Sequence, residues 1–348
     1  MIYSNPILKL SDLKFYFSSI NKKILIDNYP NKFWSNSGSE SFAIIFNSFT
    51  EVKKNIYLPK YFCGQSLSYL RGINANIIFY DIDDNFNIDF KKIKFTSKLS
   101  KSDIFVIVHY FGQISDYTKL LQLKDKINFT IIEDCAHINK PYNSRKWIGD
   151  FLMFSPHKHF PIPTIGLVLS KTKITFNYTN SKNINIIWFF KQFIKKLLNL
   201  KSTTIWKVKW SKNINVINKI GPNKTLIKIT ENFIFHDENI NNILKNNYIE
   251  ARDVIKKYPG WSILNWHNEH PYGIVVKCNS SEIARSQYYK FNEKYNLVMQ
   301  WPDLPLEIRF FKNYNEIVQL TDQILFFFID GREDNHKWIN ELKRQINE

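Results

Sequence analysis

The sequence predicts an α/β protein whose core is a largely parallel sheet with helices on both faces. From about residue 40 to residue 170, short apolar runs rich in β-branched and aromatic residues alternate with polar turns and helix-like stretches. Strands that alternate with helices in this way are typical of a parallel sheet. Ligands of such sheets bind beyond the carboxyl ends of the strands, so the polar groups at those ends are the candidate site.

The expected elements follow one another in a regular order. NIYLPK, at 55–60, is the first strand of this block, and YFCGQSLSYLRG is the helix-like stretch after it. The next strands are ANIIFYDID, DIFVIVHYFG and FTIIEDCAHI, with the helix-like SDYTKLLQLKDKI before the last of them. FLMFS and GLVLS, at 151–155 and 166–170, close the block.

The chain is expected to form two domains. A large domain over 1–250 would hold the sheet in its core, 30–170, followed by a variable, partly helical connector over 171–250. Residues 251–348, with the segments YGIVVKC and SEIARSQYYKFNEKYN, are expected to form a smaller α/β domain. A chain of 348 residues with 44% hydrophobic residues is long enough for this division.

Targeting and redox features favour a cytoplasmic protein. The longest apolar runs are much shorter than the roughly 18 residues of a membrane span, and MIYSNPILKLSDLKFYF lacks the pattern of a signal peptide. Cys63, Cys135 and Cys278 are odd in number, far apart and without CxxC spacing. This argues against a disulfide framework and a zinc site, and it fits reduced thiols.

The net charge of +17 is large enough to suggest nucleic acid, a membrane surface or acidic substrates as partners. The lysines are spread along the chain, however, so we favour a diffuse compositional bias and expect no nucleic-acid partner. The local exception is IIWFFKQFIKKLLNLKS, at 186–202, where apolar residues and lysines alternate at helical spacing. Such a helix could lie on a membrane surface, but packing on the protein's own core or on a partner subunit is favoured.

Several familiar site motifs are missing. None of the ten glycines forms GxGxxG, and GxxxxGK[ST] is also absent, so neither a dinucleotide fingerprint nor a P-loop is predicted. HNEH, at 267–270, lacks the HExxH pattern and is interpreted as a surface loop. We therefore expect no metal site.

Two segments supply polar groups at predicted strand and helix ends. SNSGSES, at 35–41, precedes the helical run FAIIFNSF, and a helix start with free backbone N–H groups suits an anion such as phosphate. In IIEDCAHI, Asp134 and His137 follow a buried strand. The alternative for that pair is a helix-capping aspartate beside a structural histidine.

FSPHKHFPIPTIG adds a lysine, Lys158, 24 positions after Asp134. An anion-binding helix start, an aromatic segment, a carboxylate and an amine are together what pyridoxal phosphate requires. Its phosphate needs N–H donors, its ring an aromatic face, its pyridine nitrogen a carboxylate and its aldehyde an amine. The sequence therefore predicts this cofactor.

The order of SGSES, YLPKYFCGQSL, ANIIFYDID, VIVHYFG, IIEDCAHI and IGDFLMFSPHKHFPIPTIGLVL resembles the DegT/DnrJ/EryC1/StrS family of sugar aminotransferases. Within it, the short lysine loop is similar to a branch that reads SPRK or SLRK. The resemblance covers about 30–170 and is weaker beyond 250. It implies the type I fold of pyridoxal-phosphate enzymes, with a mostly parallel seven-stranded sheet in the large domain and a smaller C-terminal domain. It also implies a homodimer.

The resemblance assigns the chemistry to three residues. Lys158 would form the Schiff base with pyridoxal phosphate and carry the proton during catalysis. Asp134 would hold the pyridine nitrogen protonated. His137 would lie near the phenolic oxygen of the cofactor.

It also implies cofactor-binding roles. Gly38, Ser39 and the backbone of Glu40 match the phosphate-binding helix start, and Ser155 matches a second phosphate contact. Either Tyr61 or Phe62 would stack on the ring. His109, in HYFG, matches a His-aromatic-Gly stretch whose duty stays open.

The chain departs from the family pattern at two places. Ser155 and Lys158 are three positions apart, whereas five is the commoner spacing. Thr164 and Ile165 replace the usual acidic residue and first glycine of a pair whose second member is Gly166. Because a β-branched residue does not allow the close backbone approach of a glycine, we expect a reshaped site or a changed reaction.

Three functions remain open. The leading hypothesis is an aminotransferase that moves an amino group from L-glutamate to a keto group of a dTDP-, UDP- or GDP-linked deoxysugar, for a surface polysaccharide such as O-antigen. The second is a dehydratase of the same family, in which histidine stands at the lysine position; His157 and His159 flank Lys158. The third is a catalytically inactive relative that binds a partner or an acidic polymer.

Overall fold

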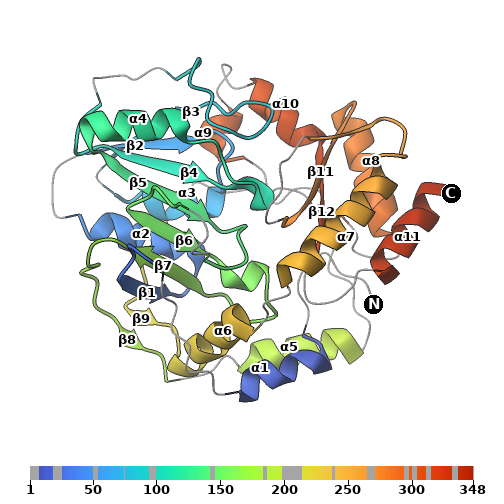
Figure 1. Cartoon of the computed structure of the whole chain (residues 1–348), viewed down its shortest axis with the longest axis horizontal. Coiled ribbons are helices and arrows are strands. Elements are labelled where there is room, and N and C mark those ends of the chain that lie inside the picture. The colour runs from blue at the N-terminus through green and yellow to red at the C-terminus, as the bar shows by residue number, and fades with distance from the viewer. Residues whose placement is uncertain are drawn as a thin grey trace.

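The computed structural model describes residues 8–18, 26–49, 54–73, 75–93, 99–141, 146–182, 186–197, 214–236, 240–264, 271–293, 298–299, 304–310, 315–330 and 336–347. Its central feature is a seven-stranded sheet in the order β1-β7-β6-β5-β4-β2-β3 (Figure 1). Only β7 runs antiparallel to its neighbours. The predicted mostly parallel sheet is confirmed. Its strands are β1 (Asn31–Ser35), β2 (Lys54–Pro59), β3 (Ala75–Tyr80), β4 (Ile104–Val108), β5 (Thr130–Cys135), β6 (Phe151–Phe154) and β7 (Gly166–Ser170).

Helices cover both faces of this sheet. Helices α2 (Gly38–Asn47) and α3 (Gly64–Leu70) pack on one face, and α4 (Thr118–Ile127) packs on the other. Strand β4 shows why: successive residues point to opposite faces, so Val106 joins the cluster of α2 while Phe105 and Ile107 join that of α4. A strand buried on both faces reads as a continuous apolar run, which is the pattern IFVIV presents.

The C-terminal part forms a smaller antiparallel sheet with its own helices, on the right in Figure 1. Its strands are β10 (Trp261–Ile263), β11 (Gly273–Cys278) and β12 (Ile324–Phe328), and its helices are α7 (Ile240–Ile255), α8 (Ser281–Asn292), α9 (Leu306–Arg309), α10 (Asn315–Gln323) and α11 (His336–Asn347). The predicted domain boundary after residue 250 falls inside α7. Because α7 packs against β10, β11 and α11, it goes with the C-terminal sheet. The two-domain division itself stays a prediction.

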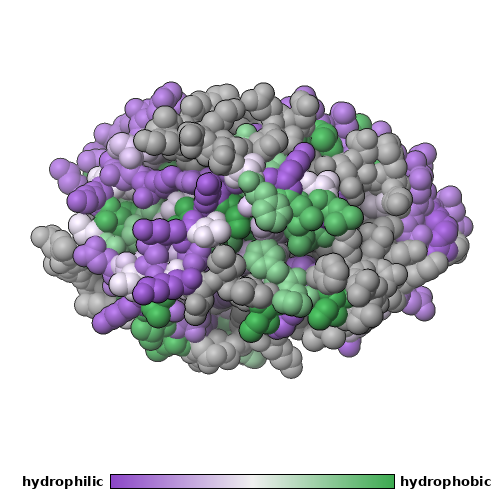
Figure 2. Space-filling model, turned by 90° about the horizontal axis from the view of Figure 1, so that it is seen from below, coloured by the Kyte–Doolittle hydropathy of each residue, from purple (hydrophilic) through white to green (hydrophobic). Residues whose placement is uncertain are grey.

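A third group of elements lies below the large sheet in Figure 1. It comprises η1 (Leu10–Asp12), α1 (Leu13–Phe17), β8 (Thr179–Asn180), α5 (Ile186–Leu197), β9 (Ile220–Gly221) and α6 (Lys224–His236). Helix α5 contacts α1 through the Tyr16 and Phe189 rings, and apolar residues gather on this underside (Figure 2). Ile187, Phe190 and Ile194 of α5 are exposed. Within the described residues, no helix is long and apolar enough to cross a membrane.

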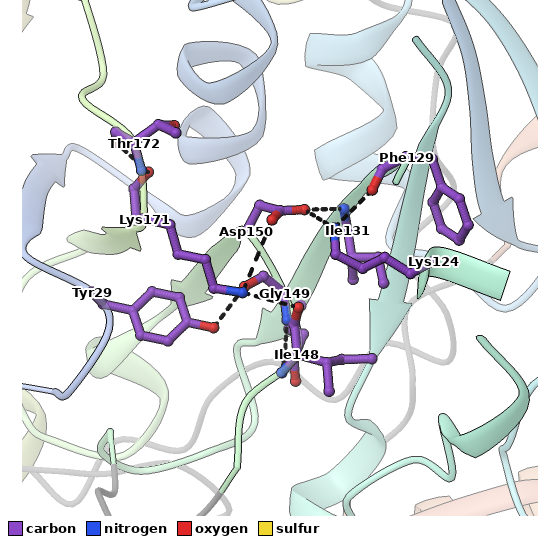
Figure 3. Close-up of polar contacts among 11 residues, drawn as sticks. Tyr29, Lys124, Phe129, Ile131, Ile148, Gly149, Asp150, Lys171 and Thr172 are labelled. Atoms are coloured by element: carbon purple, nitrogen blue, oxygen red, sulfur yellow. Dashed lines mark hydrogen bonds and ion pairs between the residues drawn. The ribbon is translucent and has the colours of Figure 1, made fainter. Parts of the chain in front are cut away.

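The amino ends of β5 and β6 are held by a polar network around Asp150 (Figure 3). Asp150 Oδ2 accepts hydrogen bonds from Lys124 Nζ at 2.6 Å and from the Ile131 N–H at 2.8 Å. Lys171 Nζ lies 4.0 Å from Asp150 Oδ1, and the Tyr29 hydroxyl donates to Gly149. These contacts fix the strands at their amino ends. The cavity lies at the opposite, carboxyl ends of the strands.

Candidate active site

The cavity has a volume of about 160 Å³ and lies at the carboxyl ends of β4, β5 and β6. Nine of the ten residues predicted from the sequence line it: Gly38, Ser39, Tyr61, Phe62, His109, Asp134, His137, Ser155 and Lys158. Glu40 is not in the lining. The wall is completed by residues to which the sequence assigned no cofactor-binding role: Ser37, Cys63, Gln65, Ser66, Val108, Ala136, Met153, His157 and Thr164. Several of these could have been found from their position beside a predicted strand end or beside Lys158.

Helix α2 points its first turn at the cavity. Ser37 is its N-cap: the Ser37 hydroxyl accepts a hydrogen bond from the Glu40 N–H at 3.0 Å. The Glu40 carboxylate in turn accepts from the N–H groups of Asn36 and Asn218, both at 2.9 Å. This is a variant of the capping box. Glu40 therefore serves the cap with both its backbone N–H and its side chain, and the N–H groups nearer the cavity are those of Gly38 and Ser39.

Gly38 allows this helix start to approach β6 closely. A Cβ atom on Gly38 would lie 2.9 Å from Ser155 Oγ and 3.1 Å from Met153 Sδ. The Ser39 hydroxyl lies 3.1 Å from the Ser66 hydroxyl, across the gap between α2 and α3. Three hydroxyls and a helix N-terminus thus surround one end of the cavity, and such groups bind anions.

The lysine segment leaves β6 through a short 3-10 turn, η3 (Pro156–Lys158). Pro156 suits its first position because no backbone N–H is needed there. The Lys158 N–H donates to Ser155 O at 3.0 Å, and the His159 N–H donates to Pro156 O at 2.9 Å. This turn places the half-buried Lys158 at the cavity, with its Nζ atom 3.1 Å from His137 Nε2.

Three histidines lie close to Lys158, and each has a lowered pKa. Burial, and secondarily the Lys158 charge, holds the pKa of His137 well below its usual value. The same two causes lower the pKa of His157 to about 4 and that of His159 to about 3. These imidazoles are therefore neutral near pH 7. His157 faces the cavity, with Nδ1 3.3 Å from Ser155 Oγ, whereas His159 is outside the lining and its ring packs 4.9 Å from that of Tyr272.

Asp134 provides the acidic group. Burial raises its pKa to about 6, while the Lys158 charge and a hydrogen bond from the Ala136 N–H act in the opposite direction. That N–H donates to Asp134 Oδ1 at 3.0 Å. The side chain is therefore mainly a carboxylate at pH 7 and above.

His109 is held by Glu133, and both side chains are fully buried. His109 Nε2 lies 2.7 Å from Glu133 Oε2, and His109 Nδ1 accepts a hydrogen bond from the Ser115 N–H. A neutral imidazole with Nδ1 as acceptor carries its proton on Nε2, so His109 donates to the carboxylate. Glu133 Oε1 also accepts from the N–H groups of Ile148 and Gly149, at 2.8 and 2.6 Å. These bonds fix the His109 ring in the cavity wall.

The two departures in the lysine loop have different surroundings. Thr164 is exposed and lines the cavity, whereas Ile165 is completely buried in a hydrophobic cluster. Close backbone approach occurs at the next residue: a Cβ atom on Gly166 would lie 2.6 Å from Ser37 O and would also overlap the Ser35 hydroxyl. Tyr61 and Phe62 are both buried in the lining, so the choice of stacking ring stays open.

The order of strand ends, the helix start and the lysine turn can be compared with known proteins. Residues 36–166 match the model of the DegT/DnrJ/EryC1/StrS aminotransferase family. The family resemblance predicted from the sequence is thus confirmed over this segment, which contains every residue that lines the cavity. No curated protein sequence matches the chain.

Solved structures share the fold over nearly the whole chain. An E. coli GDP-4-keto-6-deoxy-D-mannose-3-dehydratase with bound hydrated PLP matches 99% of this chain and 100% of its own, with a TM-score of 0.68 at 14% identity. Helicobacter pylori PseC, an aminotransferase involved in the biosynthesis of pseudoaminic acid, matches 99% and 97%, with a TM-score of 0.67 at 13% identity. A sugar aminotransferase from Streptococcus pneumoniae, Spr1654, in its PMP form, matches 100% and 98%, with a TM-score of 0.68 at 12% identity. The predicted type I fold is confirmed.

Metal ligands are not gathered anywhere in the ranges that the structure describes: no group of three or more His, Cys, Asp or Glu side chains is placed to hold an ion. The HNEH segment lies outside those ranges. The chemistry of the cavity therefore has to be argued from Lys158, Asp134 and the histidines.

Proposed function

We propose that this chain is a pyridoxal-phosphate enzyme that transfers an amino group from L-glutamate to a keto group of a nucleotide-linked deoxysugar. The observation that carries the proposal is the placement of the Lys158 amine in the cavity, 3.1 Å from His137 Nε2, with Asp134 in the same wall. The match to the sugar aminotransferase family over 36–166 adds support.

The residues present fit pyridoxal phosphate. Gly38 leaves a space that a Cβ atom would fill, and the hydroxyls of Ser39, Ser66 and Ser155 surround it. These groups and the first turn of α2 would hold the phosphate. Asp134 would hold the pyridine nitrogen, His137 the phenolic oxygen, and Tyr61 or Phe62 one face of the ring.

When bound, the cofactor supplies a carbonyl carbon for amines and a ring that withdraws electrons from the carbon atom next to them. The chain's own residues do the rest. Lys158 Nζ would take a proton from the α-carbon of the amino-group donor and later return it, and so act as a general base and then as a general acid. Asp134, ionised at neutral pH, would keep a proton on the nitrogen base that it pairs with. The buried walls of the cavity would exclude water from Lys158 and Asp134.

Amino transfer is favoured over dehydration because a lysine reaches the cavity. In the family's dehydratases a histidine stands at the lysine position, and His157 also lines the cavity here. If His157 took the catalytic role of the lysine, the Lys158 amine beside His137 would have no function. The dehydratase remains the second candidate because the solved structures that share this fold include one.

An inactive, polymer-binding relative is the third candidate. Its support is Ile165, which replaces a glycine of the family pattern, together with the net charge of +17. Ile165 is buried in the core, and its backbone is not among the described non-glycine residues with positive φ. A site that tolerates isoleucine without strain gives this candidate less support.

The remaining parts of the proposal follow the family. We propose a homodimer in the cytoplasm, with L-glutamate and a dTDP-, UDP- or GDP-linked keto sugar as substrates and a surface polysaccharide as the end product. The net charge of +17 is compatible with a diphosphate. The large domain would comprise 1–250 and the small one 251–348, with α7 at their junction.

The test starts from purified protein with pyridoxal phosphate. Borohydride reduction followed by peptide mass spectrometry should place the cofactor on Lys158, and Lys158→Ala should lose the label. With glutamate and a panel of keto nucleotide sugars, the native protein should form 2-oxoglutarate and aminated sugar in equal amounts. A sugar product that has lost water without gaining nitrogen would instead identify a dehydratase.

Two controls make the result specific. Lys171→Ala removes another lysine, at the opposite edge of the sheet, and should keep the label and the turnover. Circular dichroism should show that Lys158→Ala is folded. Label on a lysine other than Lys158, or normal turnover by Lys158→Ala, would overturn the proposal.

A further inference from the structure

His137 packs against an aromatic clamp of two rings that come from distant parts of the chain. The Phe111 ring lies 5.6 Å from the imidazole at an interplanar angle of 29°, and the Tyr272 ring lies 4.7 Å away at 14°. Phe111 follows β4, whereas Tyr272 directly precedes β11 of the C-terminal sheet. The C-terminal part of the chain therefore contributes one wall of the His137 slot.

The backbone of Phe111 joins these two rings. Its N–H donates to His137 Nδ1 at 2.9 Å, and its carbonyl accepts from the Tyr272 N–H at 3.0 Å. Phe111 achieves this in the left-handed region, with φ of 54° and ψ of 24°. For a residue other than glycine this conformation costs roughly 1–2 kcal/mol, and strain of this kind gathers at functional sites.

The hydrogen bond to Nδ1 determines where His137 carries its proton. A backbone N–H can only donate, so Nδ1 must be the acceptor, and a neutral imidazole then has its single N–H on Nε2. Burial keeps the pKa of His137 low, so the neutral form prevails near pH 7. The Nε2 atom faces Lys158 Nζ at 3.1 Å. The Nε2–H of the imidazole is therefore directed at the Lys158 amine.

We propose that Phe111 and Tyr272 are positioning residues that fix His137 as its Nε2–H tautomer, so that this N–H is held against the Lys158 amine. The inference rests on the proposed function only for the use of that amine. The clamp itself is a property of the folded chain. It follows that the C-terminal sheet completes the site through Tyr272.

The decisive experiment measures the tautomer in cofactor-free protein with ¹⁵N-labelled histidine. Long-range ¹H–¹⁵N correlations distinguish protonated from unprotonated ring nitrogens, and the His137 signals are assigned by their loss in His137→Gln. The native protein should show an unprotonated Nδ1 and a protonated Nε2 at pH 7. An Nδ1–H tautomer, or an imidazolium, would overturn the proposal, whether or not the protein uses pyridoxal phosphate.

Matched variants separate the clamp from simple core packing. Tyr272→Phe keeps the ring and should keep the Nε2–H tautomer, while Tyr272→Leu removes the ring and should give a mixture of tautomers. Phe111→Gly keeps the N–H and relieves the left-handed strain, but it removes the other ring and should therefore also give a mixture of tautomers. A pure Nε2–H form in folded Tyr272→Leu would remove Tyr272 from the proposal.

A second readout reports on Lys158 in the same proteins. Competitive labelling with trace acylating reagent, quantified by mass spectrometry, compares Lys158 with the exposed Lys101. We expect the ratio of labelling rates to change by about two- to tenfold in Tyr272→Leu, the equivalent of losing one net hydrogen bond, and to stay within twofold of native in Tyr272→Phe. Equal ratios in both variants would contradict the link between the clamp and the amine.

Discussion

Glu133 and Asp134 are neighbours in β5, yet their carboxylates serve different purposes. Glu133 accepts hydrogen bonds from His109 and from two backbone N–H groups, and it is completely buried. Asp134 accepts a hydrogen bond from the Ala136 N–H and faces the cavity. Because successive side chains of a strand point to opposite faces, one carboxylate fastens the structure while its neighbour is left for chemistry.

Asp134→Asn should stabilise the cofactor-free protein at neutral pH. The pKa of Asp134 is raised to about 6, from 3.8, chiefly by burial. A raised pKa means that stability is fully present below pH 4 and is lost as the pH rises through 6. At pH 7.5 the variant should therefore unfold at higher temperature, by on the order of 2–3 kcal/mol in free energy, with the difference vanishing near pH 4. Thermal unfolding scans across this range measure it.

Asp116→Asn is the matched contrast, because the pKa of Asp116 is lowered by hydrogen bonds from Thr118. For a lowered pKa, stability is present above the ordinary value and is lost as the pH falls. This variant should therefore lose stability at neutral pH. If both variants shifted the unfolding temperature in the same direction at pH 7.5, the burial argument for Asp134 would fail.

Glu133→Gln should destabilise the fold. The amide keeps one oxygen for the N–H groups of Ile148 and Gly149, but its NH₂ group would then face the Nε2–H of His109. His109 cannot change its tautomer to compensate, because its Nδ1 atom already accepts from Ser115. An unsatisfied buried donor costs about 1–3 kcal/mol, which urea unfolding can measure. Glu316→Gln, at an exposed ion pair with Lys92, is the control and should change stability far less, because solvent screens exposed ion pairs.

The amino-acid pattern is sufficient for the sheet and for most of the cavity, for a physical reason. Parallel strands buried on both faces have continuous apolar runs, and their carboxyl ends must meet at one edge, so the pattern alone brings His109, Asp134 and Lys158 together. The helix start is also readable. The sequence assigned the backbone of Glu40 to phosphate binding. In the folded chain Glu40 instead belongs to the helix cap formed with Ser37.

Contacts that depend on strand order or on the C-terminal sheet could not be predicted. His109 meets Glu133 only because β4 and β5 are adjacent in the sheet, and no spacing in the sequence encodes that. Tyr272 reaches His137 from more than a hundred residues away in the chain. The backbone N–H of Phe111 bonds His137 through a left-handed conformation that a phenylalanine gives no reason to expect.

Gly166→Ala should destabilise the protein because the added Cβ atom has no room. It would overlap the Ser35 and Ser41 hydroxyls and Ser37 O, where the start of β7 meets the start of α2. Overpacking of this kind costs about 1–3 kcal/mol. Gly72→Ala is the control, because its Cβ atom would meet the end of the Ile214 side chain at 3.1 Å, which can move. Chemical denaturation of both should give the larger loss for Gly166→Ala, and equal losses would contradict the close-approach argument.

Ile165→Gly would restore the glycine pair of the family, and we expect it to weaken the protein rather than improve it. Ile165 is completely buried with Phe154, Phe160 and Leu167 in one hydrophobic cluster. Truncating a buried isoleucine costs about 2–5 kcal/mol, and a glycine adds backbone entropy to the unfolded chain. Ile165→Val is the graded control, with an expected loss of about 0.5–1.5 kcal/mol.

Denaturant unfolding gives these values, and cofactor uptake measured on the same samples should not rise in Ile165→Gly. A stable Ile165→Gly with faster uptake would show that isoleucine obstructs the site. It would also restore the case for an inactive relative, since that case depends on Ile165 being incompatible with the close backbone approach that the structure instead assigns to Gly166.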